Sequence, residues 1–113
     1  MTEELSELNT YTSRSKDNIE VPSSSVIAVD TFTITKGVWL LCGYMQWNGS
    51  FNLQYNFQIG SNVVRANGTN GGGINNVVML NVTSDTQTID VRIYQPSGST
   101  QFCYYRMYMV KLK

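Results

Sequence analysis

The C-terminal stretch at residues 100–112, TQFCYYRMYMVKL, constrains the fold of this chain more than any other segment. It contains no glycine or proline and is rich in aromatic and branched side chains, a composition that favours a β-strand. Alternate residues of a strand face opposite sides of its sheet, and here neither set forms a face for water. A strand that is apolar on both faces must be covered on both faces.

The two faces of this strand call for different partners. One face consists of Cys103, Tyr105, Met107 and Met109, and the other of Phe102, Tyr104, Arg106, Tyr108, Val110 and Leu112. A buried unpaired charge costs several kcal/mol, so the face with the arginine is unsuited to a core. We therefore predict that the first face packs into the core and that other copies of the chain cover the second. The predicted contact residues are Tyr104, Arg106, Tyr108 and Val110.

Two alternatives remain for this stretch. It could be a central strand of a monomeric sandwich that lies beneath a loop. It could also be a helix, since Phe102, Arg106 and Val110 recur at every fourth position, although the composition favours a strand.

The size and charge of the chain exclude several classes of function. At 113 residues it has room for one domain with one hydrophobic core. Only 14% of the residues are charged, against about 25% in typical soluble domains, and the formal net charge is zero. Without a basic surface, nucleic-acid binding is not expected. There is no apolar run of about 18 residues and no charged-then-apolar leader, so we expect neither membrane insertion nor secretion by a signal peptide.

The beginning of the chain differs from the rest, and we predict an N-terminal anchor or stalk segment with a linker at residues 1–25 and a head domain at residues 26–113. Residues 2–11, TEELSELNTY, have helix-like spacing of Leu5 and Leu8. A helix this short is marginal alone in water, so we expect these leucines to anchor it against its own copies or against a partner protein. A frayed tail is the alternative. Residues 12–25 are polar and turn-prone, which predicts a linker.

From residue 26 onward, strand-like segments alternate with turn signals. The strands predicted before the C-terminal one are residues 26–34, 37–47, 51–59, a short one around 63–65, 74–82 and 87–95. Asn48 and Gly49 predict a hairpin, and Gly43 predicts a bulge or a close neighbour within its strand. Because no helices are present to make parallel crossovers, we predict an antiparallel all-β sandwich or jelly roll.

The residues that carry most enzyme chemistry are scarce, and we predict no catalytic, metal or cofactor site. Histidine is absent, and an exposed ion pair explains Asp90 and Arg92 on one strand face. The glycine-rich loop at residues 67–73 lacks the Lys-Ser/Thr pair and the helix of a phosphate-binding loop. Cys42 and Cys103 lie in apolar strands, where buried reduced thiols are expected and a disulfide between neighbouring strands is the alternative.

Aromatic rings next to amides suggest a sugar-binding surface, because a ring can stack on the apolar face of a sugar while amides bind its hydroxyls. The candidate ligand residues are Trp47, Asn48, Asn67, Asn70 and Tyr94. Trp47, at the predicted turn, is the first choice for the stacking ring and Tyr94 is the second. The alternative for both rings is ordinary packing.

Two groups of residues resemble those of a known family. Gly37, Val38 and Trp39, followed by Gly43, open one long strand, and a turn at residues 95–99 leads into an aromatic final strand that ends in lysine. Over residues 26–113 this pattern looks like the small jelly-roll heads of bacteriophage fibres, whose fold is similar to that of C1q and tumour-necrosis-factor domains.

This resemblance implies a homotrimer, with the first and last strands in its inner sheet and aromatic side chains near the threefold axis. It also implies a head or tail fibre of a virion assembled in the host cytoplasm, whose N-terminal segment binds a capsid or tail protein. We therefore expect a non-enzymatic virion structural protein that attaches to host-surface glycans. The alternatives are a monomeric carbohydrate-binding or adhesion module of a larger protein and a C1q-like or cytokine-like ligand domain.

Overall fold

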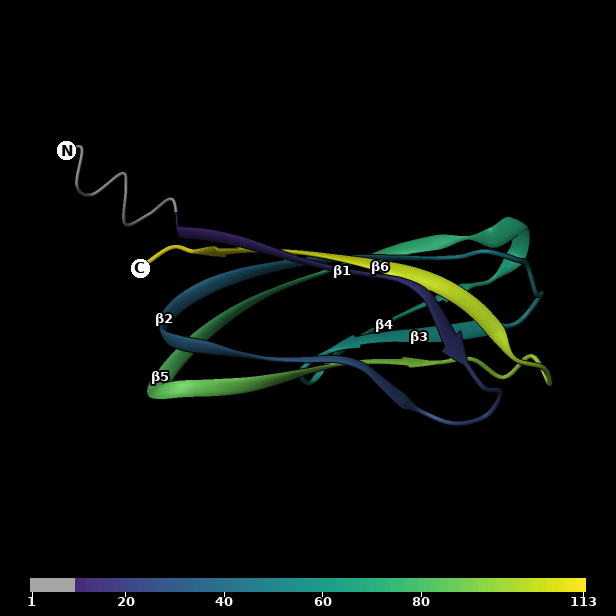
Figure 1. Ribbon diagram of the computed structural model, residues 1–113, viewed down its shortest axis with the longest axis horizontal. Coiled ribbons are helices and arrows are strands. Elements are labelled where there is room, and N and C mark those ends of the chain that lie inside the picture. The colour runs from purple at the N-terminus through teal and green to yellow at the C-terminus, as the bar shows by residue number, and fades with distance from the viewer. Residues whose placement is uncertain (1–9) are drawn as a thin grey trace.

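The computed structural model describes residues 10–113, except for the side chains of Thr10 and Asn70. These residues form one antiparallel sheet of six strands in the order β1-β6-β2-β5-β3-β4, which is not closed (Figure 1). The elements are β1 (Thr10–Val21), β2 (Ile27–Trp47), β3 (Gln54–Ile59), β4 (Asn62–Asn67), the 3₁₀ turn η1 (Thr69–Gly71), β5 (Gly73–Tyr94) and β6 (Gln101–Lys111). The predicted all-β, antiparallel class is confirmed.

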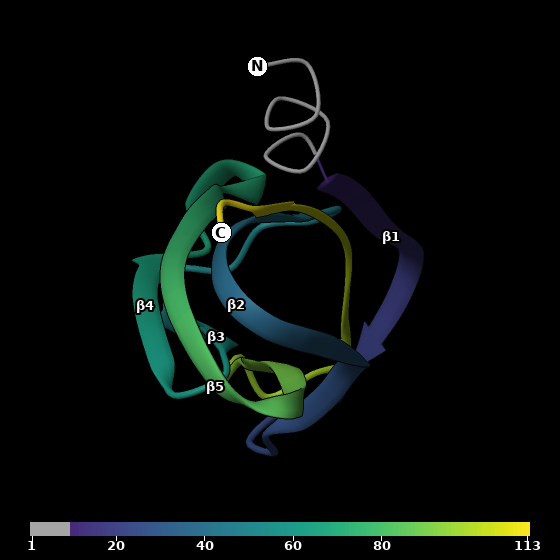
Figure 2. The same ribbon diagram turned by 90° about the vertical axis from the view of Figure 1, so that its left-hand side faces the viewer.

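The sheet folds over itself because its two longest strands bend midway. β2 and β5 pair along almost their whole lengths, with a register shift between Thr35 and Gly37. Gly37 has a φ of +142°, which residues with a side chain rarely adopt, and the carbonyl oxygen of Lys113 occupies the space where a Cβ would lie. Both strands turn back at this end of the molecule (Figures 1 and 2).

The bend divides the sheet into two layers that face each other. β6 pairs with the second half of β2 and with β1, so the first layer contains β1, β6, the second half of β2 and the first half of β5. β3 pairs with the last residues of β5 and with β4. The second layer therefore contains the first half of β2, the second half of β5, β3 and β4.

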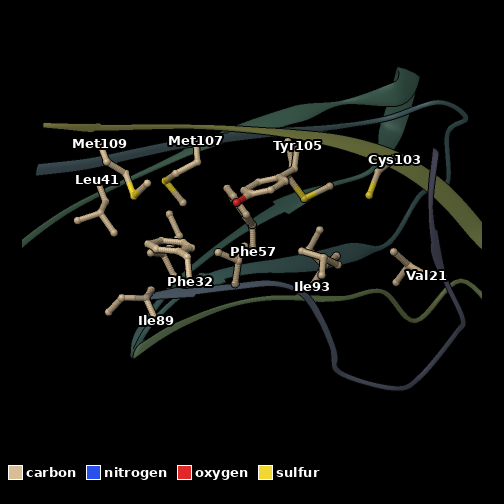
Figure 3. Packing of buried hydrophobic residues seen from close by; sticks show 14 of the residues in the cluster. Val21, Phe32, Leu41, Phe57, Ile89, Ile93, Cys103, Tyr105, Met107 and Met109 are labelled. Atoms are coloured by element: carbon tan, nitrogen blue, oxygen red, sulfur yellow. The ribbon is translucent and has the colours of Figure 1, made fainter. Parts of the chain in front are cut away.

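One hydrophobic core fills the space between the layers. Four side chains of β6 point into it, as predicted, and none is more than 3% exposed: Cys103, Tyr105, Met107 and Met109. Figure 3 shows them opposite Phe32, Ile89 and Ile93 of the second layer. This alternation along β6 confirms that the face with Cys103 packs into the core, and the helical alternative is wrong.

Gly43 marks a close approach of the two layers. It faces inward from β2, where an added Cβ would lie 2.7 Å from Ile59 Cδ1 and 3.1 Å from Phe57 Cζ of β3. The pairing of β2 with β5 and with β6 continues across Gly43 without a register shift. A close neighbour rather than a bulge therefore explains the glycine.

Four of the predicted strands are joined into two. Residues 26–34 and 37–47 belong to β2 from Ile27 onward, and residues 74–82 and 87–95 belong to β5 up to Tyr94. The residues between the predicted strands bend β2 and β5 but do not end them, because the two strands stay paired before and after the register shift.

The hairpin predicted at Asn48 and Gly49 is wrong. β3 pairs with β4 and β5, and β2 pairs with β5 and β6, so residues 48–53 carry the chain from the first layer to the second. The tight hairpin lies between β3 and β4 instead, where Gly60 adopts a φ of +58°. β3 lies in the second layer because its buried side chains, Tyr55, Phe57 and Ile59, pack in the core opposite β2.

Residues 10–21 form β1, so the linker predicted at residues 12–25 is wrong over most of its length. β1 is an edge strand that pairs with β6, and its inward positions include Arg14 and Lys16 beside Met107 and Tyr105 of β6. Polar and inward-pointing charged residues are typical of edge strands, and the same composition is typical of linkers.

The helix predicted at residues 2–11 falls mostly outside the described residues, as do Leu5 and Leu8. Thr10 and Tyr11, the described residues of that segment, begin β1.

Gly43→Ala is expected to lower the free energy of unfolding by about 1–3 kcal/mol, because the added methyl group must displace Ile59 or Phe57 in a packed core. Urea denaturation followed by tryptophan fluorescence measures the change. Gly49→Ala is the matched control, since its Cβ would lie 3.6 Å from its nearest neighbour, Gln101 Oε1. Equal stabilities of the two variants would contradict the close approach of the layers at Gly43.

Candidate functional site

The outer face of the first layer is apolar across four strands. Cross-strand pairing lines up two rows of outward side chains from β5 to β1. The first row is Met79, Leu40, Val110 and Tyr11, and the second is Val77, Cys42, Tyr108 and Ser13. We name the seven members of these rows other than the serine the apolar face.

The described chain leaves much of the apolar face uncovered. Met79 is 65% exposed, Val77 is 58% exposed and Tyr108 is 48% exposed. The rings of Tyr11 and Tyr108 stack with their centroids 6.3 Å apart, and exposed Phe102 lies further along the same side of β6. A contiguous apolar surface of this kind is typical of an interaction site.

A hydrogen-bonded aromatic cluster adjoins the apolar face. Gln46 Oε1 accepts hydrogen bonds from Tyr44 Oη at 2.7 Å and from Tyr104 Oη at 2.8 Å. The guanidinium carbon of Arg106 lies 4.8 Å from the centroid of the Tyr104 ring, and Arg106 Nη2 lies 2.9 Å from Asp17 Oδ1. The charge of Arg106 is therefore paired at the surface, away from the core.

The four residues predicted to contact other copies all lie on the outward side of β6: Tyr104, Arg106, Tyr108 and Val110. Within residues 10–113 no loop buries Tyr108, so the described chain does not support the alternative of a strand beneath a loop. Contact with other copies stays a prediction.

An ion pair with a buried carboxylate joins the two layers on the side of β1. Asp30 of β2 is 5% exposed, and a bulge at Val29 aims it inward. Its carboxylate accepts hydrogen bonds from Arg14 Nε at 2.6 Å, from Arg14 Nη2 at 2.8 Å and from Tyr105 Oη at 2.5 Å. Lys16 Nζ lies 3.8 Å from the same carboxylate. These contacts connect β1 and β6 of the first layer to β2 of the second.

The charges of this cluster follow from its contacts. Burial raises the pKa of the Asp30 carboxyl group, but hydrogen bonds from Arg14 and Tyr105 and the charges of Arg14 and Lys16 outweigh burial and lower that pKa to about 2. The hydrogen bond to Asp30 raises the pKa of Arg14, and burial is the main cause of the raised pKa of Tyr105. At neutral pH the Asp30 carboxylate is therefore ionised, and its ion pair with Arg14 links the two layers.

A buried amide joins the layers on the opposite side. Asn76 Nδ2 of β5 donates to the carbonyl oxygens of Phe57 at 3.1 Å and Asn62 at 3.0 Å, and Asn76 Oδ1 accepts from Asn62 Nδ2 at 2.6 Å. Because β3 and β4 belong to the second layer, these bonds hold the first half of β5 against it. Neither this amide nor the Asp30 cluster was predicted from the sequence. The only signal for Asn76 is its place in the inward alternation between Ile74 and Val78.

The residues predicted to bind a sugar do not form one surface. Trp47 is 2% exposed and packs edge-on against Phe51 and Tyr55, with ring centroids 5.2 Å and 5.3 Å away. The prediction that its ring stacks on a sugar is therefore wrong, and packing is the correct alternative. The reason is the path of residues 48–53, which return to the core and bring Phe51 against Trp47.

The other predicted ligand residues are spread over two parts of the surface. Asn48 is exposed beside β6, where its backbone N–H donates to the Phe102 carbonyl oxygen at 2.8 Å. Asn67 and Tyr94 lie on the outer face of the second layer, and Asn67 Oδ1 accepts from the Thr69 backbone N–H at 2.9 Å. The side chain of Asn70 lies outside the described part of the chain.

Cys42 and Cys103 are free thiols on opposite faces of the first layer. Cys103 faces the core, where burial raises the pKa of its thiol to about 12. Cys42 faces outward beside Tyr108, so it is only half-buried. The two thiols lie on opposite faces and are not bonded to each other, so the alternative of a disulfide between them is wrong. Of the two cysteines predicted to be buried, only Cys103 is.

Within residues 10–113, no three histidine, cysteine, aspartate or glutamate side chains are grouped so that they could hold a metal ion. No helix in the same part of the chain is long and apolar enough to cross a membrane. Comparisons with protein-family models, with curated proteins and with solved structures found no match. The function must therefore be inferred from the surfaces of the molecule.

Asp30→Asn is expected to lower the free energy of unfolding at pH 7 by about 2 kcal/mol, the value of a pKa lowered from 3.8 to about 2. Because the folded-state pKa lies below the unfolded value, this stabilisation is complete above about pH 4–5 and is lost as the pH falls toward 2. Urea denaturation at several pH values should show the two proteins converging in acid.

Asp90→Asn is the matched control, because it breaks an exposed pair in which Asp90 Oδ2 lies 3.0 Å from Arg92 Nη2. Its effect should stay below about 1 kcal/mol. A stability difference between wild type and Asp30→Asn that does not change with pH would contradict the role of the ionised carboxylate.

Proposed function

We propose that the protein is the trimeric head of a bacteriophage fibre, a non-enzymatic structural part of the virion that attaches to host-surface glycans. The observation that carries this proposal is the apolar face. It extends over all four strands of the first layer, in a chain of which only 14% of the residues are charged. Identical subunits that cover the face would remove it from water.

The arrangement of the strands supports a jelly-roll interpretation. When β2 and β5 are each counted once per layer, the six strands become eight, with four in each layer. A jelly roll consists of eight strands in two sheets. The first and last strands, β1 and β6, are neighbours in the layer that carries the apolar face. The resemblance to fibre heads implies the same placement of these strands, in the inner sheet of a trimer.

The apolar face supports self-association, and the resemblance to fibre heads supports three copies. A closed ring of three subunits leaves no interface unpaired, whereas an open arrangement would grow into a filament. In this trimer Tyr104, Arg106, Tyr108 and Val110 contact neighbouring subunits. The rings of Tyr44 and Tyr104, with centroids 6.2 Å apart, then lie toward the threefold axis.

The two ends of the molecule suit attachment and display. Thr10 at the start of β1 pairs with Lys111 near the C-terminus, and the loops after β2 and before β6 lie at the opposite end (Figure 1). We propose that residues 1–9, with Leu5 and Leu8, bind a capsid or tail protein. The opposite end then points away from the particle. Assembly in the host cytoplasm agrees with the two free thiols.

Sedimentation of the wild-type protein at micromolar concentration is expected to give one species of three times 12.7 kDa. Tyr108→Asp is expected to convert it to a monomer with an unchanged far-UV circular dichroism spectrum, because a carboxylate buried without a partner in the interface costs several kcal/mol. Thr33→Asp, at an exposed strand position of the second layer, is the matched control and should remain trimeric.

A wild-type monomer would contradict the fibre head and favour a monomeric carbohydrate-binding or adhesion module. A Tyr108→Asp protein that stays trimeric would exclude the apolar face as the interface.

A further inference from the structure

Two side chains on the outer face of the second layer lack the partners that others of their kind have. Arg14, Arg92 and Arg106 each bond to an aspartate, whereas Arg65 has no ion pair or side-chain hydrogen bond within residues 10–113. Six of the seven tyrosines have a neighbouring ring or a hydroxyl hydrogen bond, and within the same residues Tyr94 has neither. Both groups are therefore available to a ligand.

Strand pairing puts these two residues in one row. Asn56 of β3 pairs with Arg65 of β4 on one side and with Tyr94 of β5 on the other. Neighbouring strands lie about 4.8 Å apart, so the row spans about 10 Å. All three residues point outward, because the residues next to them along each strand pack against the core. The Asn56 amide also makes no side-chain hydrogen bond within the described chain, and we name this set the Asn56 row.

We infer that the Asn56 row binds an anionic glycan whose sugars carry carboxylate groups. The ring of Tyr94 can stack on the apolar face of a sugar, and the Asn56 amide can donate to and accept from its hydroxyls. The Arg65 guanidinium can bind a carboxylate through two parallel hydrogen bonds. Charge complementarity favours an anionic sugar over a neutral one, since Arg65 has no ion pair in the described part of the chain, while Arg92, one row away, is bound to Asp90.

The position of the Asn56 row suits the proposed attachment function. The choice of a glycan as the ligand rests on that proposed function. The row belongs to the second layer and the apolar face to the first, so a trimer that covers the apolar face leaves three rows open. Three weak sites on one particle bind a repeating polymer far more tightly than one site does. Of the ligand residues predicted from the sequence, only Tyr94 belongs to the row.

The test is binding of the full chain to immobilised polygalacturonate, with its carboxyl-reduced form as the neutral polymer of the same backbone. Wild-type protein should bind the acidic polymer, and Arg65→Gln should weaken this binding about tenfold, the loss expected for a charge-assisted hydrogen bond. Tyr94→Ala should weaken it similarly. Lys36→Gln, which removes an equal charge at the bend of β2, should leave the affinity within about twofold of wild type.

The outcomes separate this inference from the proposed fibre head. Equal binding of the two polymers, equal losses in Arg65→Gln and Lys36→Gln, or no binding by a wild-type trimer would overturn the Asn56 row and leave the trimer intact. A wild-type monomer that binds with dependence on Arg65 would support the row and overturn the trimer. If Tyr94→Ala does not fold, as judged by circular dichroism, the comparison of Arg65→Gln with Lys36→Gln decides alone.

Discussion

β6 has apolar side chains on both faces, and the need to remove both sets from water organises the molecule. The inner set is buried within the chain, where Tyr105 and Met107 are fully enclosed between the layers. Of the outer set, Tyr108 and Val110 lie among apolar side chains of β1, β2 and β5, and together they form the apolar face. Burial of apolar surface stabilises by about 25 cal/mol per Å², so covering this face is a large source of free energy that the single chain leaves unused.

The outer faces of the two layers have opposite chemistry. The first layer presents the apolar face, whereas the second presents threonine, asparagine, glutamine and arginine side chains that are suited to water. In the proposed fibre head, the first of these faces contacts sister subunits and the second is open to a polar ligand. The Asn56 row lies on the face of the second layer, where strand pairing fixes the backbone positions of its three residues side by side.

Polar contacts fix how the two layers are aligned. Hydrogen bonds depend on direction, whereas the apolar contacts of the core do not. The Asp30 cluster ties β1 to β2, and the Asn76 amide ties β5 to β3 and β4, so each open side of the bent sheet is closed by hydrogen bonds. The ionised Asp30 carboxylate stabilises the fold by about 2 kcal/mol at neutral pH. Because hydrogen bonds are directional, these contacts also specify which strands face each other.

Alternation along β6 was enough to predict its two faces, because Arg106 excludes one of them from the core. Polarity alone could not separate an edge strand from a linker at residues 12–21, since β1 is recognised only by its pairing with β6. The burial of Trp47 depends on the path of residues 48–53, because this path brings Phe51 against the Trp47 ring, where Tyr55 also packs. Such tertiary contacts cannot be read from the local sequence. The Asn56 row could not be predicted either, because the pairing of β5 with β3, which brings Tyr94 beside Asn56, joins segments far apart in the sequence.

Cys42 allows the most direct measurement of whether sister subunits cover the apolar face. It lies beside Tyr108 in that face, while Cys103 is buried and its raised pKa suppresses the reactive thiolate, so a thiol reagent reports on Cys42 in the folded protein. Cys42 of the wild type should react much more slowly than Cys42 of monomeric Tyr108→Asp, and dilution of the wild type should remove the difference. Equal reaction rates in the two proteins at the highest concentration would contradict the account.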